Sequence, residues 1–238
     1  MILHIPHSSI DTLDYIINNK VRELQRMTDW YTDDLYDIGS ATKIIFPLSR
    51  LICDVERFED DRLEDMSRFG MGVCYTTDTQ GEELRVVKHQ ERNHIIHNYY
   101  RPHHQSLSDA VDKELQTKDS TLIIDCHSFP DKSYYFNSDF KKKRPDICIG
   151  TDSFHTPVEL TERIRSFFTR QGYTVEVDNP YSGTMVPLKH YQKESKVHSI
   201  MIEINRKLYM NEDGTKSRHY PLLKQLINQI LTEIKVSY

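Results

Sequence analysis

Short apolar runs rich in β-branched residues alternate along the chain with longer amphipathic stretches. Several runs are almost continuously apolar and end abruptly at polar residues, which is typical of strands buried on both faces of a sheet. The predicted strands span residues 2–5, 43–46, 51–55, 121–126, 147–150, 174–177 and 199–204.

The amphipathic stretches predict helices between these strands. The clearest is C-terminal, where apolar residues recur at steps of three and four after Pro221: Leu222, Leu223, Leu226, Ile230 and Ile234. A second helix is expected at residues 157–171, ending at Gly172. A third stretch covers residues 92–115, and we expect Pro102 to kink it.

This alternation of strands and helices is typical of an α/β protein. We expect a mixed, mainly parallel sheet flanked by helices. The 238 residues contain no internal repeat and no Pro/Gly-rich linker, so residues 1–238 are predicted to form a single domain.

Composition narrows the class of protein. The net charge of −5 argues against a general nucleic-acid binder, whose affinity comes mainly from a cationic surface. No apolar run reaches the roughly 18 residues that a membrane span needs, and the first residues do not resemble a secretory signal. The four cysteines form no C-x-x-C pair, so we expect buried, reduced thiols in a cytoplasmic protein.

Polar residues follow or interrupt four of the predicted strands, and several of them can bind metal. These residues are His4 and His7, Asp54 and Glu56, Asp125 and His127, and Glu203 with Asn205 and Arg206. If residues 51–55 form a strand, its two-residue period places Asp54 and Glu56 on one side. Each residue taken singly has a structural explanation, but in a mostly parallel sheet the four segments converge at one edge.

Histidine and carboxylate groups are ligands that zinc prefers, and a catalytic zinc site leaves one position open for water. The chain lacks the H-E-x-x-H, G-x-S-x-G, Walker A and G-x-G-x-x-G motifs. A rival set of histidines lies on the third predicted helix: His94, His97, His103 and His104. It has no carboxylate on the same face, which favours a structural or substrate-facing role over metal binding.

Several motifs in a fixed order resemble the N-formylglutamate amidohydrolase (N-formylglutamate deformylase) family. They are P-H-S near the N-terminus, D-V-E-R-F-E-D-D at 54–61, G-M-G-V-C-Y-T at 70–76, Y-x-P-H-H-x-x-L at 100–107, D-C-H-S at 125–128, D-I-C-I-G at 146–150 and E-I-N-R-x-L-Y at 203–209. The resemblance covers nearly the whole chain. It implies a fold similar to zinc-dependent exopeptidases of the carboxypeptidase type.

The resemblance also implies an activity: hydrolysis of the N-acyl amide of an acidic amino acid, such as N-formyl-L-glutamate. By analogy with zinc carboxypeptidases, His7 and His127 are expected to bind zinc and Glu203 to act as general base. The carboxypeptidase H-x-x-E pattern would require Glu at position 10, where this chain has Ile10. We therefore expect Asp54 to be the third ligand, with Glu56 as the alternative.

Arginine suits the substrate's carboxylates, because its planar guanidinium can bind both oxygens. Arg57 and Arg206 are the expected partners, with Arg50 and Arg85 in reserve. Thr184, in the turn-rich loop 179–187, and His103 are further candidates for substrate contact. Two alternatives stay open: a related metallohydrolase for another N-acyl amino acid or small peptide, and a binding module of the same fold without catalysis.

Overall fold

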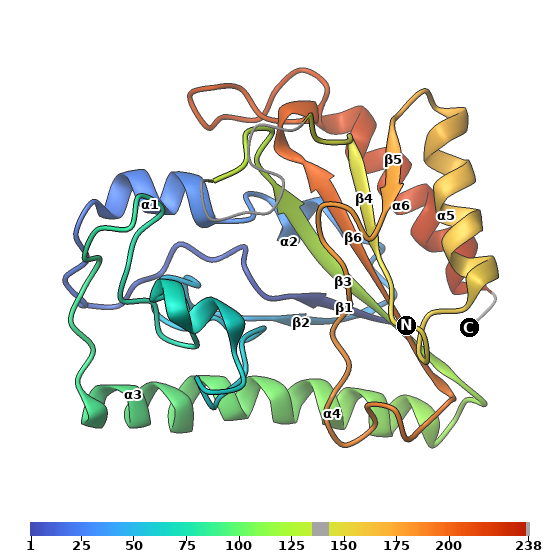
Figure 1. Cartoon of the computed structure of the whole chain (residues 1–238). Coiled ribbons are helices and arrows are strands. Elements are labelled where there is room, and N and C mark those ends of the chain that lie inside the picture. Colours follow the sequence, from blue (N-terminus) through green and yellow to red (C-terminus); the bar gives the residue numbers. More distant parts are fainter. Residues whose placement is uncertain (135–142, 237–238) are drawn as a thin grey trace.

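The computed structural model describes residues 1–134 and 143–236. A six-stranded sheet crosses the molecule in the order β2-β1-β3-β6-β4-β5 (Figure 1). Neighbouring strands are parallel except β4 and β6, which run antiparallel. The predicted mixed, mainly parallel sheet is therefore confirmed. The strands are β1 (Ile2–Ile5), β2 (Thr42–Ile45), β3 (Thr121–Phe129), β4 (Ile147–Gly150), β5 (Val175–Val177) and β6 (Val197–Asn205).

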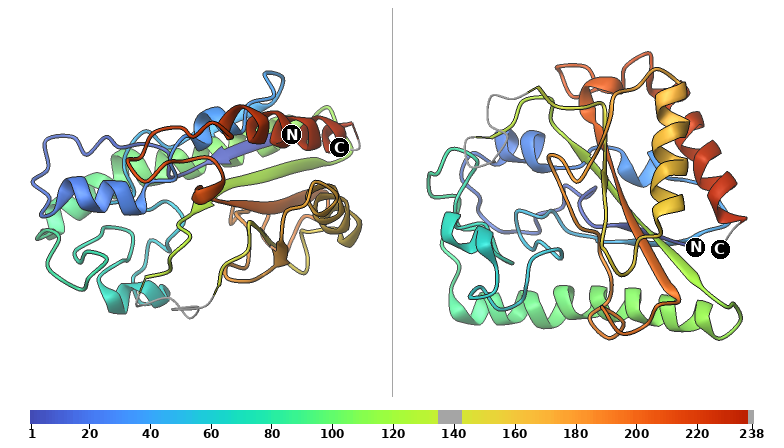
Figure 2. Two further views of the ribbon diagram at one scale, coloured as in Figure 1. Left: turned by 90° about the horizontal axis from the view of Figure 1, so that it is seen from above. Right: turned by 45° about the vertical axis from the view of Figure 1, so that its right-hand side comes forward.

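Helices cover both faces of this sheet (Figure 2). The apolar residues of α5 and α6 join the core on one face, together with those of α2, whereas α4 packs on the other face against β1, β2 and β3. The helices are α1 (Lys20–Met27), α2 (Thr32–Leu35), α3 (His89–Ile95), α4 (Arg101–Leu115), α5 (Val158–Arg170) and α6 (Tyr220–Lys235), with short helical turns η1 (Asp65–Phe69), η2 (Ile96–Tyr100) and η3 (Arg206–Leu208).

The two faces of the central strand β3 differ in character. Ile124 and Cys126 point into the core beneath α6, and Ile123 packs in the cluster beneath α4. Because side chains alternate along a strand, Asp125 and His127 share the face of Ile123. The α4 face is thus apolar at the start of the strand and polar at its carboxyl end, where ligands bind in open α/β sheets.

The expected third helix forms, but Pro102 does not break it. α3 continues through the π-helical turn η2 into α4, and Pro102 lies in the first turn of α4. Because proline lacks the N–H of a regular helical turn, the helix is irregular where Pro102 occurs: the π-helical turn η2 lies directly before α4. Figure 1 shows the three pieces as one long helix along the edge of the molecule.

The predicted strand at residues 51–55 is absent, and this segment forms turns instead. The backbone N–H groups of Ile52 and Cys53 donate to the carbonyl of Ser49, and the Asp54 side chain accepts a hydrogen bond from the N–H of Glu56 at 3.1 Å. Such local bonds compete with the ladder of a sheet. The apolar residues are still buried, but in a cluster of loops beside the sheet.

The other composition-based expectations concern cysteines and membranes. All four cysteines are free and buried, as predicted. Within residues 1–134 and 143–236, the longest apolar helices are too short or too polar to cross a membrane.

Replacing Ile124 with Ala tests the importance of the core beneath α6. Ile124 is fully buried at the centre of the sheet, so the substitution should lower the free energy of unfolding by about 2–5 kcal/mol. The measurement is urea-induced unfolding followed by circular dichroism. Ile16→Ala is the matched control, because Ile16 is 88% exposed, and equal losses in the two variants would contradict the assigned core.

Candidate metal centre and substrate cavity

The floor of the candidate site is formed by two neighbouring strands, β3 and β6. His127 on β3 lies beside Glu203 on β6 in the parallel register of the sheet. Both side chains are buried and both line the same cavity. The fold therefore places a metal-binding side chain next to a carboxyl group, at the carboxyl ends of two buried strands.

Two loops bring further ligands to this floor. His7 follows β1, where Pro6 keeps the chain extended, and Glu56 is supplied by the turn at residues 54–57. Because that turn bends the backbone, residues 54–57 lack the alternation of side chains that an extended strand would have. Asp54 and Glu56 therefore do not lie side by side on one face. Glu56 is partly exposed and lines the cavity, whereas Asp54 is fully buried behind it.

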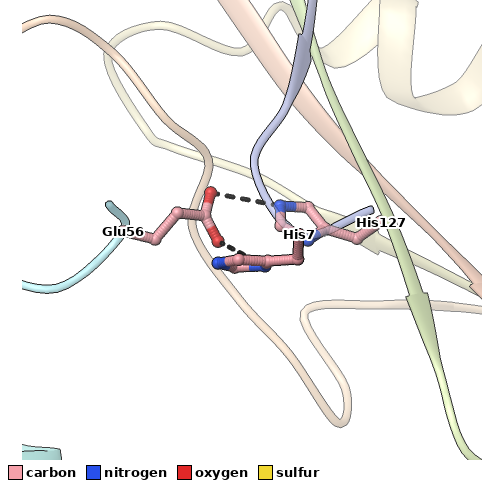
Figure 3. Close-up of side chains that lie close together, drawn as sticks. All are labelled: His7, Glu56 and His127. Atoms are coloured by element: carbon pink, nitrogen blue, oxygen red, sulfur yellow. Dashed lines mark hydrogen bonds and ion pairs between the residues drawn. The ribbon is translucent and has the colours of Figure 1, made fainter. Parts of the chain in front are cut away.

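His7, Glu56 and His127 converge. One ligand atom from each lies within 4.8 Å of the other two. Glu56 Oε1 is 3.1 Å from His127 Nε2, and Glu56 Oε2 is 3.7 Å from His7 Nδ1. Figure 3 shows the carboxylate of Glu56 facing both imidazole rings. Two imidazole nitrogens and one carboxylate form a typical set of protein ligands for a catalytic zinc ion.

The outer nitrogen of each histidine meets a buried carboxylate. His7 Nε2 is 2.8 Å from Asp54 Oδ1, and His127 Nδ1 is 3.0 Å from Asp29 Oδ2. This pairing is the usual support of metal-binding histidines, because it sets the ring orientation and the tautomer. His7 Nδ1 is buried and has no hydrogen-bond partner among the described residues, which fits a nitrogen that is available to a metal.

These contacts favour Glu56, the alternative third ligand, over Asp54. Asp54 binds the far side of His7 and is also held by Arg50 at 2.7 Å and by the Tyr75 hydroxyl at 2.7 Å. Its oxygens are therefore occupied by donors. Among the described residues, Glu56 and not Asp54 joins the two histidines in a converging group.

The pKa values of the supporting carboxyls follow from their neighbours. Burial alone would raise the pKa of Asp54, but Arg50 and His7 hold that pKa well below its usual range. Burial would likewise raise the pKa of Asp29, and its hydrogen bonds to His127 and His7 lower that pKa instead. Both groups therefore stay ionised near neutral pH and keep their role as hydrogen-bond acceptors.

Glu203 behaves differently from these carboxyls. Burial raises its pKa to about 7 despite the lowering effect of His127 and Arg206, and Asp29 and Glu56 add smaller upward contributions. Within the part of the chain that the structure describes, its buried Oε2 has no hydrogen-bond partner. A carboxyl group with a pKa near neutrality is suited to accept and return a proton.

A cavity of about 620 Å³ opens above these groups, a size that accommodates a small organic ligand. Its wall is strongly basic: four arginines line it, namely Arg26, Arg50, Arg57 and Arg206. Among the residues that the structure describes, the Nε atoms of Arg50, Arg57 and Arg206 are buried without a hydrogen-bond partner. The cavity thus combines a floor of potential metal ligands with a basic wall that attracts carboxylates.

The structure places the predicted substrate contacts unevenly. Arg57, Arg206 and Thr184 line the cavity. His103 is buried, with its Nε2 2.9 Å from His4 Nε2, and it is not among the residues that line the cavity. Its neighbour His104 lines the cavity instead.

Of the reserve arginines, Arg50 lines the cavity and Arg85 does not. Arg85 is buried, donates to the carbonyl of Ile52 at 2.9 Å and pairs with Glu91. The remaining rival histidines, His94 and His97, are exposed on the long helix and belong to neither of the two converging ligand groups among the described residues.

Sequence reasoning missed Asp29 and Arg26. Both come from the region around the end of α1, which has no recognisable motif and no strand pattern. Nothing in the local sequence marks Asp29 as the partner of a histidine 98 residues away.

Comparison with known proteins now places this site in context. The chain is similar to an N-formylglutamate deformylase of Pseudomonas putida, with 25% identity over 97% of this chain and 92% of the relative. A second N-formylglutamate deformylase, from Pseudomonas aeruginosa, is 22% identical over 90% of this chain and 83% of that protein.

Two solved structures share the fold. The crystal structure of an N-formylglutamate amidohydrolase from Ralstonia eutropha JMP134 superposes with a TM-score of 0.83 and 20% identity, covering 98% of this chain and 91% of that one. The crystal structure of the gene product Atu2144 from Agrobacterium tumefaciens superposes with a TM-score of 0.67 and 17% identity, covering 99% of this chain and 91% of that one. The family model for N-formylglutamate amidohydrolase matches residues 1–210. The chain therefore belongs to the N-formylglutamate amidohydrolase family.

Proposed function

We propose that this protein is a zinc-dependent amidohydrolase that cleaves the N-acyl amide of an acidic amino acid, with N-formyl-L-glutamate as the expected substrate. One observation carries the proposal: His7, Glu56 and His127 converge beside Glu203 at the base of an arginine-lined cavity. The similarity to two N-formylglutamate deformylases supports the same substrate class.

The donor set fits a zinc ion. His7 Nδ1, the Glu56 carboxylate and His127 Nε2 would hold it, and Asp54 and Asp29 would support the two histidines from behind. When bound, zinc polarises a carbonyl group and lowers the pKa of water. Other divalent transition metals share these ligand preferences, and the donor set does not distinguish zinc from them.

Glu203 is proposed as the group that moves the proton. Glu203 lines the cavity, and its buried Oε2 has no hydrogen-bond partner in residues 1–134 and 143–236. As a general base it takes a proton from the attacking water, and it then delivers that proton to the amide nitrogen as the C–N bond breaks. The products are the free carboxylic acid of the acyl group and the amino acid.

Arg57 and Arg206 are proposed to bind the two carboxylates of the substrate. Arg57 is only loosely engaged, with Nε 3.4 Å from Asp54 Oδ2 and Nη1 3.7 Å from Glu64 Oε1. Arg206 is anchored by donating to the backbone carbonyl of Arg26 at 2.6 Å. Both guanidinium groups keep donors for a ligand, and Thr184 adds a hydroxyl at the cavity wall.

Replacing Glu56 with Gln tests whether Glu56 is the third zinc ligand beside His7 and His127. The variant should lose its bound zinc, because a neutral amide is a poor zinc ligand. Asp54→Asn should keep zinc but bind it roughly 10–100-fold more weakly, as expected for a supporting group. Zinc content by elemental analysis and affinity by chelator competition measure both; complete zinc loss in Asp54→Asn, with retention in Glu56→Gln, would restore Asp54 as the ligand.

Replacing Glu203 with Gln tests the general base. Zinc content should stay at the wild-type level, whereas kcat should fall by about 10²–10⁴ because the proton acceptor is removed. Steady-state kinetics with N-formyl-L-glutamate and elemental analysis of the same sample measure the two effects. Normal turnover by a zinc-loaded Glu203→Gln protein would show that another group is the base.

Replacing Arg57 or Arg206 with Lys tests carboxylate binding. Each variant should raise KM for N-formyl-L-glutamate by about tenfold or more and change kcat less, because lysine keeps the charge but loses the bidentate geometry. Arg62→Lys is the matched control, since the Arg62 side chain is 89% exposed and pairs with Asp60 outside the cavity. Unchanged KM in both cavity variants would remove these residues from the substrate site.

A panel of N-formyl, N-acetyl and N-succinyl amino acids separates the proposed substrate from the alternatives. Preference for N-formyl-L-glutamate supports the proposal, and preference for another compound indicates a related metallohydrolase. Zinc binding at full stoichiometry without hydrolysis of any compound would instead indicate a binding module.

A further inference from the structure

A buried chain of polar side chains connects α4 to the candidate metal centre. His103 Nε2 lies 2.9 Å from His4 Nε2, and His4 Nδ1 lies 2.7 Å from Asp125 Oδ1. His4 and Asp125 are almost completely buried, and His103 is 6% exposed. None of these contacts belongs to the proton transfer or substrate binding described above.

The direction of the central hydrogen bond follows from chemistry. An ionised carboxylate can only accept hydrogen bonds, so His4 Nδ1 carries the hydrogen and donates a hydrogen bond to Asp125. This bond joins β1 to the neighbouring strand β3 and holds the Asp125 carboxylate in one orientation.

Asp125 has two further contacts, one to each part of the site. Its Oδ1 is 3.1 Å from His127 Nε2, the nitrogen that faces Glu56. Its Oδ2 accepts a hydrogen bond from the backbone N–H of Met185 at 2.8 Å. Met185 directly follows Thr184 in the loop over the cavity. One carboxylate thus touches a proposed metal ligand and the substrate-facing loop.

The same loop is attached at two other points. The Ser199 hydroxyl donates to the carbonyl of Met185 at 2.8 Å and lies 2.7 Å from the Thr184 hydroxyl. Gly150 lets the loop approach closely, because a Cβ atom there would lie 2.3 Å from the carbonyl oxygen of Gly183. Ser199 therefore fixes the loop without touching His127, whereas Asp125 touches both.

A second metal ion is the competing explanation for this cluster. Ligand atoms of His4, Glu56 and Asp125 also lie within 4.8 Å of one another. However, His4 is held between Asp125 and His103, so both of its ring nitrogens already have partners. His7 Nδ1 at the proposed zinc site, by contrast, has no hydrogen-bond partner among the described residues.

We propose that Asp125, oriented by His4 and His103, is a positioning residue: it holds the Thr184 loop over the cavity, while its negative charge lies beside the nitrogen of His127 that would bind the metal. The inference rests on the proposed function, because it assigns a role relative to the proposed zinc site. Asp125 itself contacts neither the reacting atoms nor the ion in this assignment.

The test compares Asp125→Asn with Ser199→Ala in the full-length protein. The Asn side chain has one acceptor oxygen, so its amide NH₂ group must face either the Met185 N–H or the N–H of His4. Asp125→Asn should weaken zinc affinity by about tenfold or more, because it removes a negative charge beside the cation, and raise KM by about tenfold through the loosened loop. Ser199→Ala should raise KM similarly and leave zinc affinity unchanged, since it affects only the loop.

Zinc affinity is measured by chelator competition and KM with N-formyl-L-glutamate. Wild-type zinc affinity in a folded Asp125→Asn variant overturns the inference, as does a binding stoichiometry of two zinc ions in the wild-type protein. If Asp125→Asn does not fold, ¹⁵N histidine NMR of the wild-type protein decides. His4 Nδ1 should keep its proton when zinc is added. Loss of that proton would identify His4 as a ligand of a second ion.

Failure of the proposed function gives a different result. A wild-type protein that binds no zinc, or hydrolyses none of the N-acyl amino acids, contradicts the function itself. A wild-type protein that is active with one zinc ion, combined with an unaffected Asp125→Asn variant, contradicts only the role of Asp125.

Discussion

The candidate site depends on two hydrogen bonds between buried charged or polar groups: His7 with Asp54, and His127 with Asp29. Each bond occupies the outer nitrogen of an imidazole ring and so turns the other nitrogen toward Glu56. Burying carboxylates is costly unless they are paired, and the protein meets this cost with the histidines and, for Asp54, with Arg50. Without these pairs, the converging nitrogens would have neither a defined orientation nor a defined tautomer.

The sheet gives this arrangement its rigid base. His127 and Glu203 stand side by side on adjacent parallel strands. Cys126 before His127, and Ile202 and Ile204 on either side of Glu203, pack into the core under α6. The strands therefore keep the ligand and the proposed base at a constant separation, while His7 and Glu56 come from loops. Such a division, with part of the site on rigid strands and part on loops, is common in α/β proteins.

Charge is also divided within the cavity. Carboxyl groups gather at the base, where a cation would bind, and arginines form the wall, where anionic parts of a substrate would lie. Arg50 stands between the two regions, because it neutralises Asp54 while lining the cavity. The same opposition explains why Glu203 differs from Asp54: burial without a close cationic donor raises its pKa to about 7, whereas Arg50 and His7 lower that of Asp54.

Local pattern was enough to predict most of the fold. Buried strands are nearly continuous apolar runs, so β1, β3, β4 and β6 were visible, and period-three and period-four spacing revealed α5 and α6. The ordered motifs also pointed to His7, His127 and Glu203, all of which line the cavity. The strand predicted at 51–55 was wrong because the side chains of Ser49 and Asp54 accept backbone hydrogen bonds that stabilise turns there. This bend, together with partners distant in sequence such as Asp29, determines which carboxylate faces the histidines. Only the tertiary structure could show this, because hydrogen bonds between residues far apart in the chain leave no local periodicity.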